Sequence, residues 1–314
     1  MNMNMENVYI IIPVHNRKAM TLQCLDALEK NGDLHQYHVI IIDDGSTDGT
    51  SEAVKSLYPD VFILQGDGDL WWTGAIRKGM EYAYDKGAEY FIWLNDDCLV
   101  TNKAIEKLVR FCKDNPKSII GSQGCQFDNN QSIAFGGHTR KNQSFQAIIC
   151  PENKVLECDV VSGNLVCLPR LVIDIVGYPE ANLYPHYLGD FIFLIKSKNR
   201  GFKIYVSNQS NLLNLCSTKS ELEANRWLLQ NGQPLDILRL IFIDRSILSW
   251  QVWFTLHKEE SGSFLGTLNF IVFYGIKSLI PVILITFLRF LPLSFRYKLS
   301  EIKCKLIYKS PRII

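Results

Sequence analysis

Three side chains that could hold a cation, Asn95, Asp96 and Asp97, directly follow an apolar run at residues 90–94. A short apolar run that ends in polar residues is typical of a buried strand. Carboxylates at the end of such a strand are costly to bury without a partner, and a divalent cation that carries phosphates is a suitable one. The same residue types form turns and helix caps, here before a helix expected at residues 102–112. This stretch alone leaves a cation site and a simple turn as alternatives.

Three earlier apolar runs also end in polar residues, and helical patterns separate them. The runs at residues 8–14, 39–42 and 61–64 are followed by His15 to Arg17, by Asp43 and Asp44, and by a loop at residues 66–74. Helices are expected near residues 22–28, 52–57 and 75–86. Apolar strands that alternate with helices predict a parallel sheet covered on both faces. Ligands bind such sheets beyond the carboxyl ends of the strands, so the polar ends predict one shared site.

Composition and the absence of some motifs narrow the class of protein. The 314 residues suffice for one large α/β domain or two smaller ones. A net charge of +1 is too small to attract nucleic acid through the overall charge of the protein. No G-x-G-x-x-G motif opens the first helix, so the dinucleotide-binding fingerprint is absent. The 9 cysteines include no C-x-x-C pair, which predicts reduced, mostly buried thiols in a cytosolic protein. The polar start and Pro13 lead us to expect no signal peptide.

The stretch after the acidic residues has a less regular pattern. We expect strands at residues 119–122 and 203–206, a loop or hairpin at 135–138, a turn at Ser162 to Asn164 and a helix at 191–198. Beyond residue 220 the chain becomes helical and apolar, with helices expected at 222–229 and 235–256 and a strongly apolar stretch at 264–293. The mean hydropathy of residues 270–288 is roughly 2, which is within the range of transmembrane helices.

The chain after this apolar stretch is a basic tail, with Arg296, Lys298, Lys303, Lys305, Lys309 and Arg312. A single span would place the tail on the side opposite to a cytosolic domain, against the positive-inside rule. We therefore expect one or two helices that lie on the inner face of the cell membrane, with residues 264–314 against anionic lipid. An ordinary buried helical hairpin is the alternative.

The motifs, in this order, resemble the family-2 inverting glycosyltransferases, whose nucleotide-sugar-binding domain has the GT-A fold. They are I-I-P-V-H-N-R at residues 11–17, I-I-I-D-D-G-S-T-D-G-T at 40–50, W-L-N-D-D at 93–97 and G-Y-P-E-A-N-L-Y-P-H-Y-L-G-D-F-I-F at 177–193. A further motif, G-D-G-D-L-W-W-T-G-A-I-R-K-G at 66–79, is similar to a subgroup that builds bacterial surface polysaccharides, including rhamnosyltransferases. The resemblance covers about residues 7–215 and implies an α/β, GT-A type, Rossmann-like, mainly parallel sheet flanked by helices.

The resemblance also implies how the chain is divided and which residues bind the donor. A catalytic domain over residues 1–220 would have a nucleotide-sugar half (1–100) and an acceptor half (101–220), followed by a helical, hydrophobic and basic region at 221–314. The matching positions imply a donor pocket formed by Pro13, His15, Arg17, Asp44, Trp71, Trp72, Gly74, Asn95 and Asp96.

Individual roles follow from the same resemblance. Asp44 would accept the N3–H of a uracil or thymine base, Asp96 would hold the ribose hydroxyls, and Asp97 would bind Mg²⁺ or Mn²⁺ that bridges the diphosphate. Asn95 departs from the family pattern, because an amide replaces the first Asp of the D-x-D motif.

The same carry-over assigns the catalytic step. Asp190 would be the general base that takes the proton of the acceptor hydroxyl, with Glu180 as the next candidate. A helix N-cap is the alternative role of Asp190. Trp71 and Trp72 would stack on a base or sugar or would only pack in the core. Neither His138 nor His186 has another candidate ligand at ligand spacing in the sequence, and contact with an acceptor or phosphate is the less favoured interpretation of each.

The sequence therefore predicts an inverting glycosyltransferase. It would transfer a sugar from a UDP- or dTDP-sugar to a saccharide or lipid-linked acceptor in surface-polysaccharide synthesis, at the cytoplasmic face of the membrane. A sugar-phosphate nucleotidyltransferase is one alternative, but residues 13–20 contain no glycine for a triphosphate loop. A non-catalytic sugar-binding or scaffold subunit of the same fold is the other.

Overall fold

The chain divides into two compact units, unit 1 (Met1–Thr218) and unit 2 (Lys219–Ile314). The structure is a computed structural model that describes residues 6–127, 132–141, 144–215, 228–229 and 232–299. Most of the helix predicted at 222–229 lies outside these residues, as do Cys216, Cys304 and the basic tail after residue 299.

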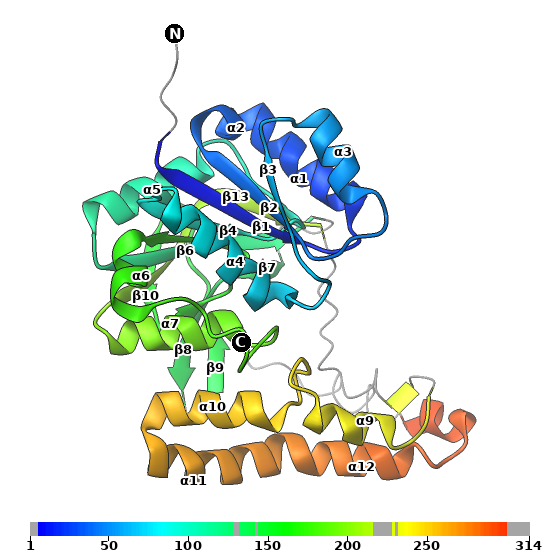
Figure 1. Cartoon of the computed structure of the whole chain (residues 1–314). Coiled ribbons are helices and arrows are strands. Elements are labelled where there is room, and N and C mark those ends of the chain that lie inside the picture. Colours follow the sequence, from blue (N-terminus) through cyan, green and yellow to red (C-terminus); the bar gives the residue numbers. More distant parts are fainter. Residues whose placement is uncertain (1–5, 128–131, 142–143, 216–227, 230–231, 300–314) are drawn as a thin grey trace. The chain divides into compact units, whose positions relative to one another are not determined.

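Unit 1 is built on a 10-stranded sheet (Figure 1). Along the sheet the strands lie in the order β10 (Val155–Cys158), β13 (Lys203–Asn214), β6 (Ser118–Gln126), β12 (Leu165–Pro169), β4 (Tyr90–Leu94), β1 (Val8–Val14), β2 (His38–Asp43) and β3 (Phe62–Gln65). Strand β5 (Cys98–Leu99) pairs with β13, and β7 (Ile133–Phe135) pairs with β6. Strands β3, β2, β1 and β4 run parallel, whereas β12 is antiparallel to both its neighbours. The predicted mainly parallel sheet is confirmed.

Three strands lie outside this sheet. They form a smaller antiparallel sheet in the order β11 (Val160–Val161), β8 (Gly137–Lys141) and β9 (Ser144–Ala147). The predicted turn at Ser162 to Asn164 separates β11 from β12, so the apolar run that contains it serves both sheets.

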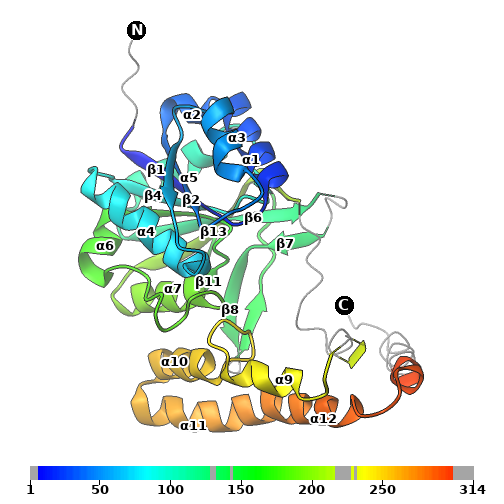
Figure 2. The ribbon, with the colours of Figure 1, turned by 45° about the vertical axis from the view of Figure 1, so that its right-hand side comes forward.

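Helices cover both faces of the large sheet (Figures 1 and 2). One face carries α1 (Lys18–Asn31), the short α2 (Asp33–Gln36), α3 (Thr50–Leu57) and α5 (Ala104–Asp114). Apolar side chains of α1, α3 and α5 form one buried cluster with Val8, Ile10, Ile12 and Val14 of β1. The other face carries α4 (Trp71–Asp85), α6 (Arg170–Val176) and α7 (Gly189–Asn199). Burial from both sides explains why the strand sequences are continuously apolar.

One predicted boundary in unit 1 is wrong. We expected a loop through Gly74 and a helix from Ala75, but α4 begins at Trp71. The carboxylate of Asp44 accepts hydrogen bonds from the backbone N–H groups of Gly68, Leu70 and Trp71 at 2.9, 3.2 and 2.9 Å. A distant side chain thus satisfies N–H groups before and at the helix start, and local sequence does not reveal it.

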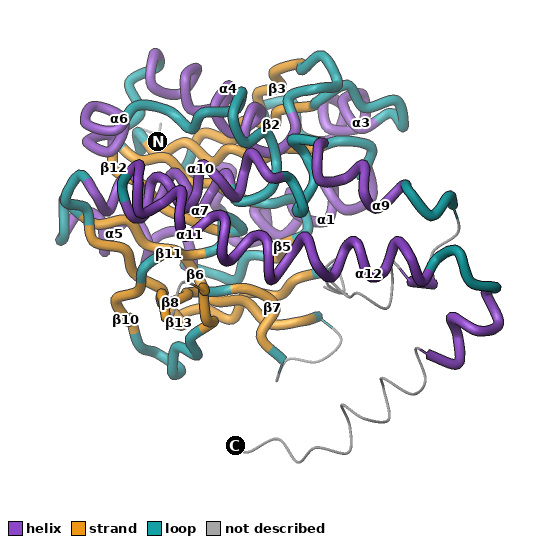
Figure 3. Tube along the Cα trace, turned by 90° about the horizontal axis from the view of Figure 1, so that it is seen from below, coloured by secondary structure: helices purple, strands orange, loops and turns teal. Residues whose placement is uncertain are grey.

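Unit 2 consists of helices that share one apolar core. They are α9 (Asp236–Arg239), η1 (Leu240–Phe242), α10 (Trp250–Ser261), α11 (Ser263–Tyr274), η2 (Gly275–Leu279) and α12 (Ile280–Leu288). The last three follow one another without interruption as a helical rod (Figure 3). Its inner side chains, among them Tyr274, Val282 and Ile285, pack against Ile237 and Leu248.

The predicted single helix at 235–256 is wrong, because the chain turns between η1 and α10. The side-chain oxygen of Ser246 accepts the N–H of Leu248 at 3.1 Å, and its carbonyl accepts the N–H of Ser249 at 2.9 Å. Serine competes in this way with helical hydrogen bonding. Among the described residues, no helix combines the length and the apolar character that crossing a membrane requires.

The approach of α4 to the sheet depends on one glycine, and this can be tested. A Cβ at Gly79 would lie 2.4 Å from Cγ2 of Ile11 and 3.2 Å from Cδ1 of Ile42. We expect Gly79→Ala to lower the free energy of unfolding by about 1–3 kcal/mol, because the added methyl group overpacks this interface. Urea unfolding followed by circular dichroism measures the change.

Gly275→Ala is the matched control for this substitution. It also lies in helical backbone, but its added Cβ would have nothing within 4 Å. It should leave stability unchanged or raise it by up to about 1 kcal/mol. A Gly79→Ala protein as stable as the wild type would contradict the close approach of α4 to β1.

Candidate donor-binding and catalytic site

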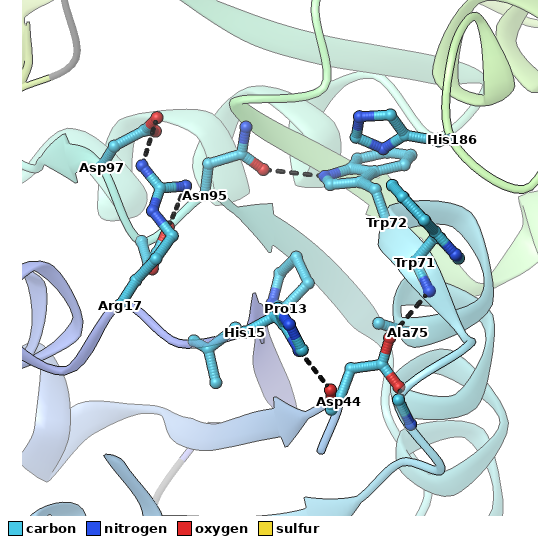
Figure 4. Close-up of a pocket in the computed structure, with 13 residues that line it drawn as sticks. Pro13, His15, Arg17, Asp44, Trp71, Trp72, Ala75, Asn95, Asp97 and His186 are labelled. Atoms are coloured by element: carbon cyan, nitrogen blue, oxygen red, sulfur yellow. Dashed lines mark hydrogen bonds and ion pairs between the residues drawn. The ribbon is translucent and has the colours of Figure 1, made fainter. Parts of the chain in front are cut away.

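A pocket with a volume of about 420 Å³ lies at the carboxyl ends of β1, β2 and β4 (Figure 4). Its lining residues come from segments far apart in the sequence: Pro13, Val14, His15, Arg17, Asp44, Gly68, Trp71, Trp72, Ala75, Asn95, Asp96, Asp97 and His186. The polar strand ends that the sequence singles out therefore meet in one place. This is the geometry of parallel sheets, whose carboxyl ends share one edge.

Asp44 connects the floor of this pocket to the start of α4. Asp44 is only 5% exposed, and its carboxylate is paired by hydrogen bonds from three backbone N–H groups. The carbonyl oxygen of Asp44 accepts a hydrogen bond from Nδ1 of His15 at 2.5 Å, and Nε2 of His15 accepts one from the amide of Asn16 at 3.0 Å. These two partners select the Nδ1–H tautomer of His15.

The two tryptophans occupy different positions. Trp71 is 38% exposed, and its ring centroid lies 5.3 Å from that of His186. Trp72 instead donates its indole N–H to the side-chain oxygen of Asn95 at 2.8 Å and packs edge-on against Trp93. Both tryptophans thus line the pocket: Trp71 is the more exposed ring, whereas Trp72 is partly buried and orients Asn95 (Figure 4).

Trp71 also has an uncommon backbone conformation. Its φ of 55° lies in the left-handed region, which bulky residues adopt rarely and at a cost of about 1–3 kcal/mol. The N–H of Trp71 is held by Asp44, and its indole N–H is held by Asp69 at 3.2 Å. These bonds offset the strain and hold the indole at the pocket wall.

The acidic pair at the end of β4 is bridged by an arginine. Arg17 places Nη1 2.9 Å from Oδ1 of Asp96 and Nη2 3.2 Å from Oδ2 of Asp97. Asp96 is only 2% exposed, and burial raises its pKa to about 7, although Arg17 and the Thr21 hydroxyl, 3.3 Å away, oppose that shift. Asp96 and Asp97 do form a turn between β4 and β5, closed by a hydrogen bond from the Cys98 N–H to the Asn95 carbonyl at 3.1 Å. They do not cap α5, which begins at Ala104 with Lys103 at its N-cap.

Asp96 and Asp97 offer carboxylate oxygens, which are suitable ligands for Mg²⁺ or Mn²⁺. Among the described residues, no group of three or more His, Cys, Asp or Glu side chains could hold an ion unaided. Mg²⁺ commonly takes one or two carboxylates and completes its shell with phosphate oxygens and water. Asp97, with a side chain 13% exposed in the pocket, fits such a site, provided that a diphosphate supplies the other oxygens.

Asp190 lies beside the pocket rather than in its lining. One carboxylate oxygen accepts the N–H of Gly163 at 2.8 Å, and the other accepts the N–H of Phe191 at 2.8 Å. A Cβ at Gly163 would lie 2.6 Å from the Trp72 ring and 3.1 Å from Cβ of Asp190, so the glycine allows both to approach. Burial raises the pKa of Asp190 above its ordinary value, although these N–H groups oppose the shift.

Glu180 has a different environment. It accepts a hydrogen bond from Nζ of Lys196 at 2.5 Å and one from the hydroxyl of Tyr184 at 3.2 Å. The Glu180 side chain is 45% exposed, and its carboxylate is paired with a cation of α7.

The predicted alternative role of Asp190, a helix N-cap, is not its position in the structure. Leu188 is the N-cap of α7, so Asp190 lies inside the first turn of that helix.

Several lining residues were not among the predicted donor residues, and one predicted donor residue, Gly74, does not line the pocket. Val14, Gly68 and Ala75 are small or apolar and carry no recognisable chemical signal, whereas His186 is a residue type that sequence reasoning could rank higher. Gly74 is buried in α4, where its Cβ position lies 3.3 Å from Leu70 and 3.7 Å from Ala181.

Comparison with known proteins gives partial matches to glycosyltransferases. Poly(ribitol-phosphate) beta-glucosyltransferase of Bacillus spizizenii is 28% identical over 116 residues, which is 36% of this chain and 18% of that protein. GalNAc(5)-diNAcBac-PP-undecaprenol beta-1,3-glucosyltransferase of Campylobacter jejuni is 23% identical over 137 residues, which is 42% of this chain and 43% of that protein. The chain therefore spans less than half the length of either relative.

The fold and the family agree with these matches. The crystal structure of GalNAc-T7 with UDP, GalNAc and Mn²⁺ superposes with a TM-score of 0.59 at 13% identity, over 87% of this chain and 56% of that one. That likeness shows the fold alone, and it is the GT-A arrangement expected from the sequence. Residues 9–162 match the family model described as glycosyl transferase family 2. The chain thus carries a glycosyltransferase family 2 domain.

Proposed function

We propose that this protein is a metal-dependent inverting glycosyltransferase. It transfers a sugar from a UDP- or dTDP-sugar to a saccharide acceptor, which is lipid-linked, in the synthesis of a bacterial surface polysaccharide. The observation that carries this proposal is the pocket in which Asp44, the exposed face of Trp71 and the pair Asp96–Asp97 come together. The Campylobacter jejuni relative is named for a saccharide acceptor linked to undecaprenol, and this supports the choice of a lipid-linked acceptor.

The roles in donor binding follow from the position of each group in the pocket. Asp44 accepts the N3–H of the base at the inner end, and Trp71 stacks on the donor. Asp96 holds the ribose hydroxyls. Asp97 holds Mg²⁺ or Mn²⁺, which, when bound, offsets the negative charge that develops on the departing diphosphate. Asn95, oriented by Trp72, donates its amide N–H to the donor.

The transfer itself uses Asp190 as the general base. The acceptor oxygen forms a bond to the anomeric carbon from the face opposite the diphosphate, and the bond from that carbon to the diphosphate oxygen breaks. The hydroxyl proton passes to the Asp190 carboxylate, and the nucleoside diphosphate leaves with the electron pair. Burial next to Trp72 and Gly163 raises the pKa of Asp190, which makes it a stronger base than an exposed aspartate.

Donor binding tests the first part of the proposal. A panel of nucleotide sugars is titrated by calorimetry with and without Mn²⁺, and one UDP- or dTDP-sugar should bind in a metal-dependent way. Asp97→Asn should weaken that affinity by about 10–100-fold, because the ion loses its carboxylate. Asp67→Asn, at an exposed carboxylate outside the pocket lining, is the control and should bind like the wild type. Donor binding without any turnover would instead favour the non-catalytic scaffold alternative.

The choice of base gives a second prediction. Asp190→Asn should lower kcat by about 10²–10⁴-fold, because the amide cannot take the proton, and donor affinity should stay nearly unchanged. Glu180→Gln should retain most of the activity, because Glu180 is paired with Lys196. Transfer is measured as release of the nucleoside diphosphate. An active Asp190→Asn enzyme together with an inactive Glu180→Gln enzyme would assign the base to Glu180.

The acceptor part of the proposal rests on the surface of unit 2. Seven large side chains, each more than half exposed, recur along one side of the rod formed by α11, η2 and α12. We call them the apolar stripe: Phe264, Leu268, Ile271, Ile276, Ile280, Leu284 and Phe287. Their spacing of three to five residues is that of one helix face. A continuous exposed apolar face of this length is typical of helices that lie in a membrane interface.

The charge of the same region favours an anionic membrane as its partner. From Ser261 to Ser300 the sequence contains no Asp or Glu, whereas Lys277, Arg289, Arg296 and Lys298 are cationic. Arg289 is buried and bonds the Gln233 carbonyl at 3.0 Å, so it contributes to the fold rather than to the surface. Basic residues beside an apolar helix face add electrostatic attraction to anionic lipid. We propose that the protein is peripheral on the cytoplasmic face of the membrane.

Vesicle binding tests the membrane contact. The protein should co-sediment with phosphatidylglycerol vesicles, and the double variant Ile276→Glu with Leu284→Glu should bind at least about tenfold more weakly, because each side chain loses its apolar burial. Leu57→Glu, at a side chain of unit 1 that is 60% exposed, is the control and should not change binding. A double variant that binds vesicles like the wild type contradicts the contact. A wild-type dimer that the double variant dissociates would show that a second copy covers the stripe.

A further inference from the structure

Arg17 occupies the side of Asp97 that faces the pocket, where the proposed function requires a metal ion (Figure 4). Its guanidinium spans two carboxylates, with Nη1 2.9 Å from Asp96 and Nη2 3.2 Å from Asp97. Planar guanidinium groups suit such a bridge, because their donors form a fixed fork. A side chain of the protein itself therefore neutralises the carboxylate that the proposed function assigns to the metal ion.

The backbone of Arg17 is fixed, whereas its side chain is partly exposed and its Nη2 also contacts the Met20 sulfur at 2.7 Å. The loop that carries it is tied to the neighbouring loop after β2: Asn16 donates its N–H to Ser46 at 2.9 Å, and Lys18 donates its N–H to Asp48 at 2.9 Å. The Arg17 side chain is 35% exposed and lines the pocket. Its guanidinium can therefore change partners without a movement of the loop.

The two contacts of Arg17 are not equivalent. Asp96 is almost fully buried, so removing its cation would leave a buried carboxylate that still accepts a hydrogen bond from the Thr21 hydroxyl, at 3.3 Å. The Asp97 side chain is 13% exposed and lies farther from the guanidinium. Breaking the contact with Asp97 costs less, because water or a new cation can take its place.

The guanidinium of Arg17 weakens the binding of a divalent cation to Asp97. Two positive groups on one carboxylate would lie within about 4 Å of each other, and their repulsion cancels much of the attraction that the carboxylate offers the ion. A diphosphate changes this balance, because it supplies ligands for the ion and a bidentate anionic partner for arginine.

We propose that Arg17 is a gate that makes metal binding depend on the nucleotide. Without the nucleotide it holds Asp97 and weakens the binding of the ion there. When the nucleoside diphosphate arrives, the guanidinium leaves Asp97 for the diphosphate, and Asp97 becomes free to bind the ion. Arg17 thereby acts as a positioning residue that couples the two ligands. The proposal deepens the donor site of the proposed function and rests on it.

Mn²⁺ binding without any turnover tests the gate. Free Mn²⁺ is measured by electron paramagnetic resonance as the full-length protein is titrated, with and without UDP. The wild type should bind Mn²⁺ weakly alone and much more tightly with UDP. Arg17→Gln should bind Mn²⁺ alone at least about tenfold more tightly than the wild type, because the competing cation is gone, and should gain less from UDP. Arg17→Lys, which keeps a charge but loses the fork, should be intermediate.

Two controls separate the possible failures. Asp97→Asn should bind Mn²⁺ poorly with or without UDP, and thermal unfolding in EDTA shows whether each variant is folded. If Arg17→Gln is unfolded, the comparison of Arg17→Lys with the wild type still tests the gate. The gate requires that Arg17→Lys bind Mn²⁺ without UDP more tightly than the wild type does. The gate alone is overturned by the following pair of results. The wild type binds Mn²⁺ more tightly with UDP, but without UDP both Arg17 variants bind Mn²⁺ with the same affinity as the wild type. A wild type that binds no Mn²⁺ even with UDP overturns the metal site of the proposed function, and the gate with it.

Discussion

Carboxylates buried at the carboxyl ends of neighbouring parallel strands must each find a partner, and the site is arranged around that constraint. Asp44 at the end of β2 is paired by three backbone N–H groups at the start of α4. Asp96 after β4 is paired by Arg17 and Thr21 of the segment that follows β1. Each pairing joins two segments that are distant in sequence. The energetic need to satisfy a buried charge therefore also holds the walls of the pocket in position.

The wall formed by the start of α4 depends on this arrangement most directly. Trp71 has a left-handed backbone, and that conformation is held by bonds from its own N–H to Asp44 and from its indole to Asp69. The next residue, Trp72, also lines the pocket but is partly buried, packs against Trp93 and bonds Asn95. The adjacent aromatics thus differ in their contacts, one as the more exposed ring and one as a support for Asn95. Strain at a pocket residue that the surroundings hold in place is common at functional sites.

Much of this arrangement could be predicted from the sequence, because it follows from local patterns. Apolar runs predicted strands, and each run is followed by polar residues that include Arg17, Asp44 or Asp97. A parallel sheet brings the carboxyl ends of its strands to one edge, so these residues meet in the pocket. The start of α4 was predicted four residues too late, since the bond from Asp44 that stabilises it spans 27 residues. The break between η1 and α10 depends on a local serine turn that helical periodicity hides. The separate roles of the two tryptophans, and the bridge from Arg17, depend on contacts between segments that no window of sequence contains.

The pairing of Asp44 also limits which nucleotide the proposed donor can carry. A carboxylate has about four lone-pair sites, and backbone N–H groups occupy three of them, two on Oδ1 and one on Oδ2. One acceptor site on Oδ2 remains for the base. Uracil and thymine present a single N3–H on the relevant edge and match it. Guanine presents two adjacent donors, an N–H and an amino group, and would need two acceptor sites side by side. If the base binds to Asp44 as proposed, the bonds that start α4 would favour a uridine or thymidine donor over a guanosine donor, because they leave Asp44 only one acceptor site.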